Sequence, residues 1–217
     1  MKILVGQPKR EENLEQLTYE IQKHEHVDVI LYPESYVKSG KLDEVAGLAK
    51  KIETTIVTGY KDDQNLDRSF IVNADGEVIL DRAKTPENDN LYMPSKAIDQ
   101  QANMGYLLCR EVFQGEEGLP TEDQYDIIFN PIGVGMFSEE QFVEWTSEAR
   151  KIAKSRKALV IGASHADGSY RNCGFSIPIA YCFDEEGQDV LVSHNDTRSR
   201  MIDTNLRKVE VLEYSMS

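Results

Sequence analysis

The chain has 217 residues, and its 38 Asp and Glu outnumber its 24 Lys and Arg, so the formal net charge is −14. This length can bury the core of one large domain, and we expect a single domain over residues 1–217. The negative charge would repel phosphate backbones, and no segment is apolar for long enough to span a bilayer, so neither nucleic acid nor a membrane is an expected partner.

The N-terminal segment and the cysteines favour a cytoplasmic protein. Residues 1–13 contain only about four apolar residues before Pro8 and then a run of charge, which is too short for the apolar region of a signal peptide. Cys109, Cys173 and Cys182 are an odd number of cysteines in a fairly large chain, so a disulfide framework is not expected. We expect free thiols in a reducing compartment.

The first third of the chain alternates strand and helix patterns. Short apolar runs indicate buried strands, and between them apolar residues recur every three or four positions, as on one face of a helix. Leu14, Leu17 and Ile21 form such a face in the first predicted helix. The predicted strands are residues 2–7, 27–33 and 54–60, and the predicted helices are residues 11–26 and 41–53.

The rest of the chain adds antiparallel strands. Residues 68–83 are two alternating runs joined by Ala74, Asp75 and Gly76, which predicts a hairpin because Asp and Gly tolerate positive φ. The further predicted elements are strands at 105–109, 125–131 and 158–164, a helix at 138–157 capped by Ser138, a hairpin at 175–196 that turns at 184–188, and a closing edge or interface strand at 208–214. This order predicts a layered α/β fold with a mixed sheet or two packed sheets.

Three reactive side chains follow three of the strand-like runs. Glu34, Lys84 and Cys109 each come just past an apolar run, and ligands of α/β proteins bind in the crevice at the carboxyl ends of strands. If the strands are neighbours, Glu34 can take the proton of the Cys109 thiol while Lys84 favours the thiolate. Lys84 and the backbone N–H after the nucleophile can then stabilise an oxyanion. The three residues together predict a thiol-based active site.

Each of these residues also has a simpler interpretation when it is taken alone. Cysteine is among the most buried residue types, so Cys109 is also consistent with a core position. Glu34 is consistent with a loop residue or an anion at a helix N-terminus. Lys84 is consistent with a solvated surface lysine. Only their shared position at strand ends favours a common site.

The motifs around these residues resemble those of the nitrilase, or carbon-nitrogen hydrolase, superfamily. "LYPES" resembles its glutamate motif, "DRAK" its lysine motif, and "GYLLCREVF" its nucleophile motif, and the later segments resemble the family nearly to the end of the chain. The resemblance implies an α-β-β-α four-layer sandwich with mixed β-sheets. It also implies Glu34 as general acid/base, Lys84 as oxyanion stabiliser and Cys109 as the nucleophile that forms a thioester.

The same resemblance implies a small-molecule amide as substrate and a homodimer or a higher homo-oligomer. We expect no cofactor, and no metal because the four histidines show no HExxH pattern. Members of the family commonly carry a second glutamate between the lysine and the cysteine, and Glu87 and Asp89 are the counterparts that this chain offers. Arg110 either binds a substrate carboxylate or pairs with Glu111 or other surface acids. Asn130, in the segment that resembles the strand after the nucleophile, is a further candidate for substrate binding.

The expected function is therefore an amidase-type carbon-nitrogen hydrolase. A cysteine acyltransferase that uses the same three residues is the nearest rival, and a catalytically silent nitrilase-like protein that binds a small molecule or a partner is another. A protease-like pair of Cys109 with His165 is also conceivable, but nothing in the sequence brings the two together. For Cys173 and Cys182, packing within strands is the favoured role, and Gly133 to Gly135 are expected in a loop.

Overall fold

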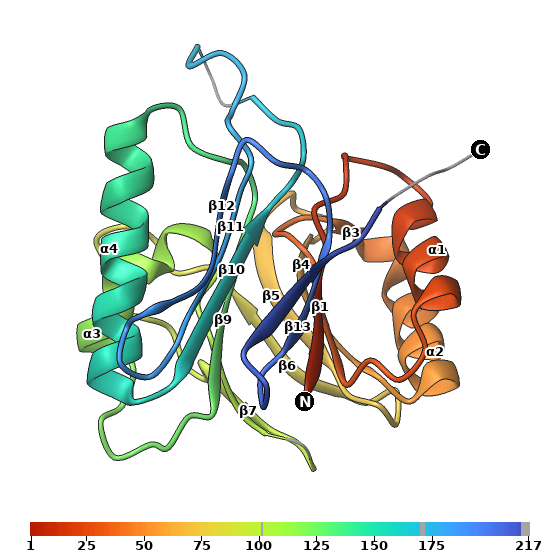
Figure 1. Ribbon diagram of the computed structural model, residues 1–217. Coiled ribbons are helices and arrows are strands. Elements are labelled where there is room, and N and C mark those ends of the chain that lie inside the picture. The colour runs from red at the N-terminus through yellow and green to blue at the C-terminus, as the bar shows by residue number, and fades with distance from the viewer. Residues whose placement is uncertain (101, 170–171, 214–217) are drawn as a thin grey trace.

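The computed structural model describes residues 1–100, 102–169 and 172–213, which form two β-sheets with helices against them. Figure 1 shows four layers, with a helical layer on the left, two sheets in the middle and a second helical layer on the right. The predicted α-β-β-α sandwich with mixed sheets is therefore confirmed.

The first sheet contains eight strands. They are β1 (Lys2–Val5), β2 (Val29–Leu31), β3 (Val37–Lys38), β4 (Thr55–Lys61), β5 (Asp67–Val72), β6 (Val78–Ala83), β13 (Arg200–Asp203) and β14 (Lys208–Val211). Along the sheet they run β14, β13, β1, β2, β4, β5 and β6, and β3 pairs with β4. β1, β2 and β4 are parallel, whereas β5 and β6 form the predicted antiparallel hairpin.

The second sheet contains six strands. They are β7 (Lys96–Ile98), β8 (Asn103–Tyr106), β9 (Ile127–Ile132), β10 (Leu159–Ser164), β11 (Ile179–Phe183) and β12 (Asp189–His194). They run in the order β12, β11, β10, β9, β8 and β7, with β8, β9 and β10 parallel and the outer strands antiparallel.

The helices bury one face each against a sheet. The helical elements are α1 (Glu15–Lys23), the 3-10 turn η1 (Ser39–Lys41), α2 (Leu42–Ile52), the 3-10 turn η2 (Cys109–Glu111), α3 (Val112–Gly118) and α4 (Glu139–Arg156). α1 and α2 cover the first sheet, and α3 and α4 cover the second. Ser138 caps α4 as predicted, because its side chain accepts the N–H of Gln141. Among the described residues, no helix combines the length and apolarity needed to cross a membrane.

The main core lies between the two sheets. In β1, Ile3 and Val5 point into this core, while Leu4 between them packs beneath α1 and α2. Burial on both faces explains why the strand is a continuous apolar run rather than an alternating one. Cys182 of β11 belongs to the same core, so its predicted packing role is confirmed.

The structure differs from the predicted elements near two of the cysteines. The strand predicted at 105–109 ends at Tyr106, because the chain leaves the sheet and turns sharply at Cys109. Cys173 is exposed in a turn, so a packing role within a strand is wrong for this residue. The seven-residue α3 was not predicted from "VFQGEEG", which contains two glycines and little apolar periodicity. The last residue of the closing strand predicted at 208–214, Tyr214, lies outside the described residues.

Candidate active site

The two sheets bring the three predicted reactive residues to one place. β2 is parallel to β4, and β6 has the same direction as β4 because β5 is antiparallel to both, so these strands end at one edge of the first sheet. Glu34 follows β2 at this edge, and Lys84 directly follows β6. Cys109 comes from the opposite sheet, just after β8. The three residues therefore lie together at strand ends, as expected, but the strands belong to two facing sheets rather than to one sheet.

The three side chains lie beside one another. The Lys84 ammonium lies 2.6 Å from Glu34 Oε1, and the Cys109 thiol is close enough to the Glu34 carboxylate for that charge to raise the pKa of the thiol. The backbone of Gly133 is also close to the Cys109 sulfur and lowers the same pKa. Glu34 is buried, with 6% of its side chain exposed, whereas 23% of the Lys84 side chain is exposed. The arrangement places one base, one cation and one thiol within hydrogen-bond reach of one another.

The site holds the thiol protonated at rest. Burial raises the pKa of Cys109 to about 12, and the Glu34 carboxylate contributes to the rise, while Lys84 and the Gly133 N–H oppose it. Burial also raises the pKa of Glu34, against the effect of the Lys84 charge. For Lys84, burial would lower the pKa, but the neighbouring Cys109 and Glu34 outweigh it and the pKa is raised. Lys84 therefore stays cationic, and the thiol needs a base when it reacts.

Cys109 lies at a strained turn. Its φ is 53°, in the left-handed region that residues with a Cβ adopt only when the surroundings hold them there. The side-chain amide of Asn130 donates to Leu107 O at 2.6 Å and to Cys109 O at 2.9 Å, and its Oδ1 accepts from Tyr181 OH at 2.5 Å. Asn130 is fully buried, so its amide group is occupied by partners within the protein.

A buried ion pair ties this turn to the strand that carries Lys84. Both Nη atoms of Arg82 contact the Glu111 carboxylate, at 2.8 and 2.7 Å, and both side chains are buried. Glu111 also accepts the backbone N–H groups of Thr85 and Leu108, each at 2.6 Å. Sequence reasoning missed Arg82, although it stands inside the "DRAK" motif, because its partner is 29 residues away, in the turn η2 that follows a strand of the other sheet.

The predicted substrate-binding residues other than Asn130 lie at the surface. Arg110 pairs with Glu87 at 2.7 Å, with 44% and 62% of their side chains exposed. Of the two predicted roles of Arg110, this geometry matches pairing with a surface acid other than Glu111. Asp89 accepts a hydrogen bond from the Tyr92 hydroxyl. Neither Glu87 nor Asp89 has a recorded hydrogen bond or ion pair with Glu34, Lys84 or Cys109 in the described part of the chain.

Gly133 and His165 also border the site. A Cβ at Gly133 would overlap Glu34 Oε2, so the loop needs glycine at this position. His165 is buried, and its Nε2 donates to the Glu34 carbonyl oxygen at 3.0 Å, which leaves Nδ1 without a hydrogen-bond partner among the described residues. Burial lowers the pKa of His165 to about 4. His165 thus touches the Glu34 backbone, and none of its recorded hydrogen bonds goes to Cys109.

An open pocket adjoins Glu34 and Gly133. It has a volume of about 390 Å³, and its walls come from the loops that follow β1, β2, β9 and β10 and from residues of β3, β4 and β5 near the same end of the first sheet. Its lining residues are Arg10, Glu11, Ser35, Tyr36, Lys38, Lys61, Asp67, Gly133, Val134, His165 and Ser169. The pocket therefore lies where strand-end ligands bind in α/β proteins.

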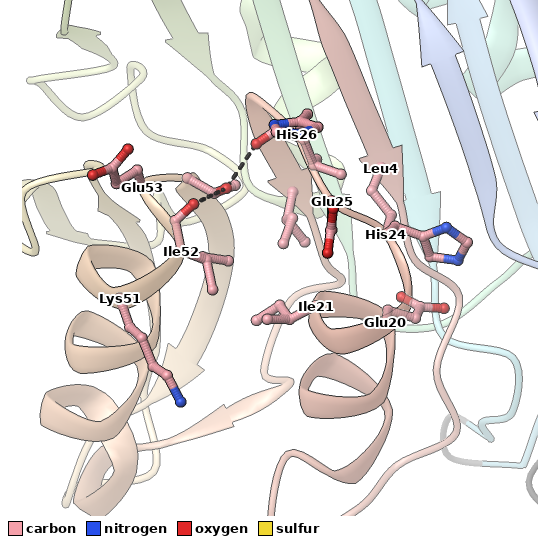
Figure 2. A pocket seen from close by; sticks show the side chains of 12 residues that line it. Leu4, Glu20, Ile21, His24, Glu25, His26, Lys51, Ile52 and Glu53 are labelled. Atoms are coloured by element: carbon pink, nitrogen blue, oxygen red, sulfur yellow. Dashed lines mark hydrogen bonds between the residues drawn. The ribbon is translucent and has the colours of Figure 1, made fainter.

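A second hollow lies away from these residues, between the C-terminal ends of α1 and α2. Figure 2 shows its lining side chains, among which the rings of His24 and His26 lie apart from each other. Among the described residues, no group of three or more His, Cys, Asp or Glu side chains could hold a metal ion. We find no reacting group here comparable to the Cys109 thiol.

Comparison with other proteins identifies the fold. The sequence matches no protein-family model and no curated protein. The structure is similar to a carbon-nitrogen hydrolase from Helicobacter pylori G27, with a TM-score of 0.73, 16% identity, and coverage of 95% of this chain and 90% of that chain. It is also similar to Nit3 of Saccharomyces cerevisiae, a member of branch 10 of the nitrilase superfamily, with a TM-score of 0.72, 14% identity, and coverage of 95% and 91%.

A third similar structure shows a modified active-site cysteine. It is a variant of the amidase from Nesterenkonia sp. AN1, in which acrylamide has added to that cysteine. The TM-score is 0.68 at 14% identity, and the match covers 94% of this chain and 92% of that chain. With these three matches over nearly the whole length, the chain has the fold of the nitrilase, or carbon-nitrogen hydrolase, superfamily.

Proposed function

We propose that this protein is a carbon-nitrogen hydrolase of the amidase type, which cleaves a small amide through a thioester on Cys109. The observation that carries the proposal is the contact of the Cys109 thiol with a carboxylate that is itself paired with Lys84. A fold that is shared with carbon-nitrogen hydrolases supports the same reaction class.

The first half of the reaction forms the thioester. Glu34 takes the thiol proton as the Cys109 sulfur attacks the amide carbon, and the carbonyl oxygen becomes an oxyanion. Lys84 and the backbone N–H of Arg110, at the start of the turn η2, stabilise that charge. The tetrahedral intermediate then collapses, the carbon-nitrogen bond breaks, and Glu34 returns its proton to the nitrogen, so that ammonia leaves.

The second half regenerates the thiol. Glu34 takes a proton from a water molecule, which attacks the thioester carbon. The carbon-sulfur bond breaks, the Cys109 sulfur regains a proton, and the product leaves as a carboxylic acid. The raised pKa of Glu34 suits this alternation, because a carboxyl group with a pKa nearer to neutrality both accepts and donates protons readily.

The test is ammonia release by the purified protein with a panel of ω-amides, N-carbamoyl compounds and nitriles, in parallel with Cys109→Ala. Turnover by the wild type and its loss in the variant are expected. Addition of hydroxylamine distinguishes hydrolysis from acyl transfer, since an acyltransferase gives hydroxamate in preference to the acid. Turnover that survives in Cys109→Ala would rule out the thiol mechanism.

A second candidate is a catalytically silent protein that binds a small molecule. It is favoured by the places of Glu87 and Asp89, which lie at the surface rather than beside Lys84. Under this alternative the wild type releases no ammonia from any compound, and a ligand binds equally well to Cys109→Ala. A covalent acyl adduct on Cys109, found by intact-mass spectrometry, would exclude it.

A homodimer or higher homo-oligomer is proposed as the working form. Sedimentation of the full chain at micromolar concentration tests it, and a single monomeric species would refute it.

A further inference from the structure

The pocket beside Glu34 has an uneven set of charges. Its two acidic lining residues are already engaged: Asp67 is paired with Lys61 at 2.8 Å and accepts from Ser35, and Glu11 accepts from the Tyr36 hydroxyl and the Gln16 N–H. Both acids are therefore held by donors within the protein.

The cations that line the pocket differ in whether an acidic side chain pairs with them. Lys61 is paired with Asp67, and Lys38 lies 3.5 Å from Glu12. Arg10 contributes one guanidinium contact, in which Nη2 donates to Gly133 O at 3.2 Å, and its backbone N–H donates to Asp167. Within the described part of the chain, no carboxylate forms an ion pair with the Arg10 side chain. Arg10 is thus the lining cation that still has its charge and several N–H donors to offer.

Gly133 brings this guanidinium close to the reacting residues. Its carbonyl oxygen accepts from Arg10 Nη2 at 3.2 Å, and a Cβ on Gly133 would overlap Glu34 Oε2. Gly133 also lines the pocket together with Arg10. Arg10 and Glu34 therefore lie against the same residue, and we infer that the far end of a substrate bound at Cys109 points toward Arg10.

We propose that Arg10 recognises an anionic group of the substrate, and that the substrate is an amide with a carboxylate a few carbons from the scissile bond. This inference rests on the proposed amidase function. The planar guanidinium matches a carboxylate through two parallel hydrogen bonds. Of the two acidic lining residues, Asp67 is paired with Lys61, and burial raises the pKa of Glu11, which disfavours its charged form. Binding of a substrate carboxylate was one of the two roles predicted for Arg110, but the Arg110 side chain pairs with Glu87, and we assign this role to Arg10 instead.

The experiment compares two amides of similar shape, succinamate and succinamide, which differ in whether the far end carries a carboxylate. The wild type is expected to have a kcat/KM for succinamate at least tenfold above that for succinamide. Arg10→Gln is expected to lower this ratio about tenfold or more, the range for the loss of a charged hydrogen bond. Arg198→Gln, at a remote exposed arginine, removes the same charge and is expected to leave the ratio unchanged. A ratio that Arg10→Gln does not change, or that falls in Arg110→Gln instead, overturns the proposal.

A second probe does not depend on turnover. Modification of Cys109 by 3-maleimidopropionate and by N-ethylmaleimide compares an anionic reagent with a neutral one, and mass spectrometry locates the adduct. Wild-type Cys109 is expected to favour the anionic reagent, and Arg10→Gln is expected to reduce that preference. If neither amide is hydrolysed but this preference depends on Arg10, the amidase function fails while the anion site stands. If the preference is the same in both proteins, the anion site fails.

Discussion

Arg82 and Glu111 form a buried, two-pronged ion pair that joins the end of β6 to the turn that carries Cys109. Arg82 also donates to Pro94 O, Ala83 O and the Ser95 hydroxyl, so that its guanidinium is surrounded by acceptors. Since Lys84 is two residues from Arg82 and Cys109 is two residues from Glu111, the pair holds the segment of the cation against the turn of the nucleophile.

Glu111→Gln tests this pair. The change leaves the Arg82 charge buried without its partner, which typically costs about 3 to 5 kcal/mol in the free energy of unfolding. We expect a loss of that order in urea denaturation and a large fall in kcat. Glu87→Gln is the matched control, because its pair with Arg110 is exposed and worth about 1 kcal/mol or less. Equal stability of the two variants would contradict the role of the buried pair.

The protonated state of Cys109 gives a second prediction. A thiol with a pKa of about 12 has little thiolate at neutral pH, so its alkylation by iodoacetamide should rise about tenfold per pH unit between pH 8 and 10, without a plateau. Lys84→Met removes the charge that lowers this pKa, and we expect slower alkylation at every pH. The rates are measured by mass spectrometry in a Cys173→Ser background, since Cys173 is exposed. A plateau below pH 8 would indicate a resting thiolate instead.

The sequence was sufficient to place the candidate residues at strand ends but not to show how they meet. Glu34, Lys84 and Cys109 follow apolar runs that are readable because strands buried on both faces have few polar residues. Their contact depends on two sheets packing face to face, which is a long-range property that no local pattern contains. Arg82 and Glu111 illustrate the same limit, because each looks like an ordinary surface charge until its partner is known.

The departures from the predicted elements also have a physical cause, which is tertiary packing that overrides weak local propensity. α3 is short and contains Gly115 and Gly118, both with low helix propensity, and tertiary packing stabilises it. Gly115 is needed there, because a Cβ would overlap the side chains of Leu107 and Ile152. No pattern in the sequence predicts that the Asn130 amide contacts the backbone of the Cys109 turn.

Removal of the Asn130 amide is the third prediction. Asn130→Ala leaves the buried carbonyl groups of Leu107 and Cys109 without the Asn130 donor, at a cost of about 1 to 3 kcal/mol, and it frees the strained turn at Cys109 to relax. We expect a fall in kcat larger than the change in KM. Tyr181→Phe, which removes only the hydrogen bond to Asn130 Oδ1, should have a smaller effect on both stability and kcat. An Asn130→Ala enzyme with normal kcat would contradict a positioning role.

Gly133→Ala is the fourth prediction. The added methyl group overlaps Glu34 Oε2 and displaces the carboxylate from Lys84 and Cys109, so we expect activity to fall strongly while circular dichroism stays native. Gly47→Ala is the control, because nothing lies within 4 Å of a Cβ at this position in α2. Alanine there should leave activity unchanged and stabilise the helix by about 1 kcal/mol. Normal activity of Gly133→Ala would show that the carboxylate position is not critical.

His165 gives a prediction about acid stability. The unfolded chain binds a proton at this histidine near pH 6.5, whereas the folded protein binds it only near pH 4, because the ring is buried. Between these values the unfolded state holds more protons, so the free energy of unfolding falls as the pH is lowered from 6.5 to 4, by about 3 kcal/mol in total from this residue.

His165→Gln cannot take up the proton, and its amide nitrogen can still donate to the Glu34 carbonyl oxygen. Urea denaturation between pH 7 and pH 4 should therefore show that acidification lowers the free energy of unfolding less for His165→Gln than for the wild type. His26→Gln, at an exposed position, should keep the wild-type dependence. If His165→Gln and the wild type lose stability in parallel, other buried groups must account for the acid sensitivity.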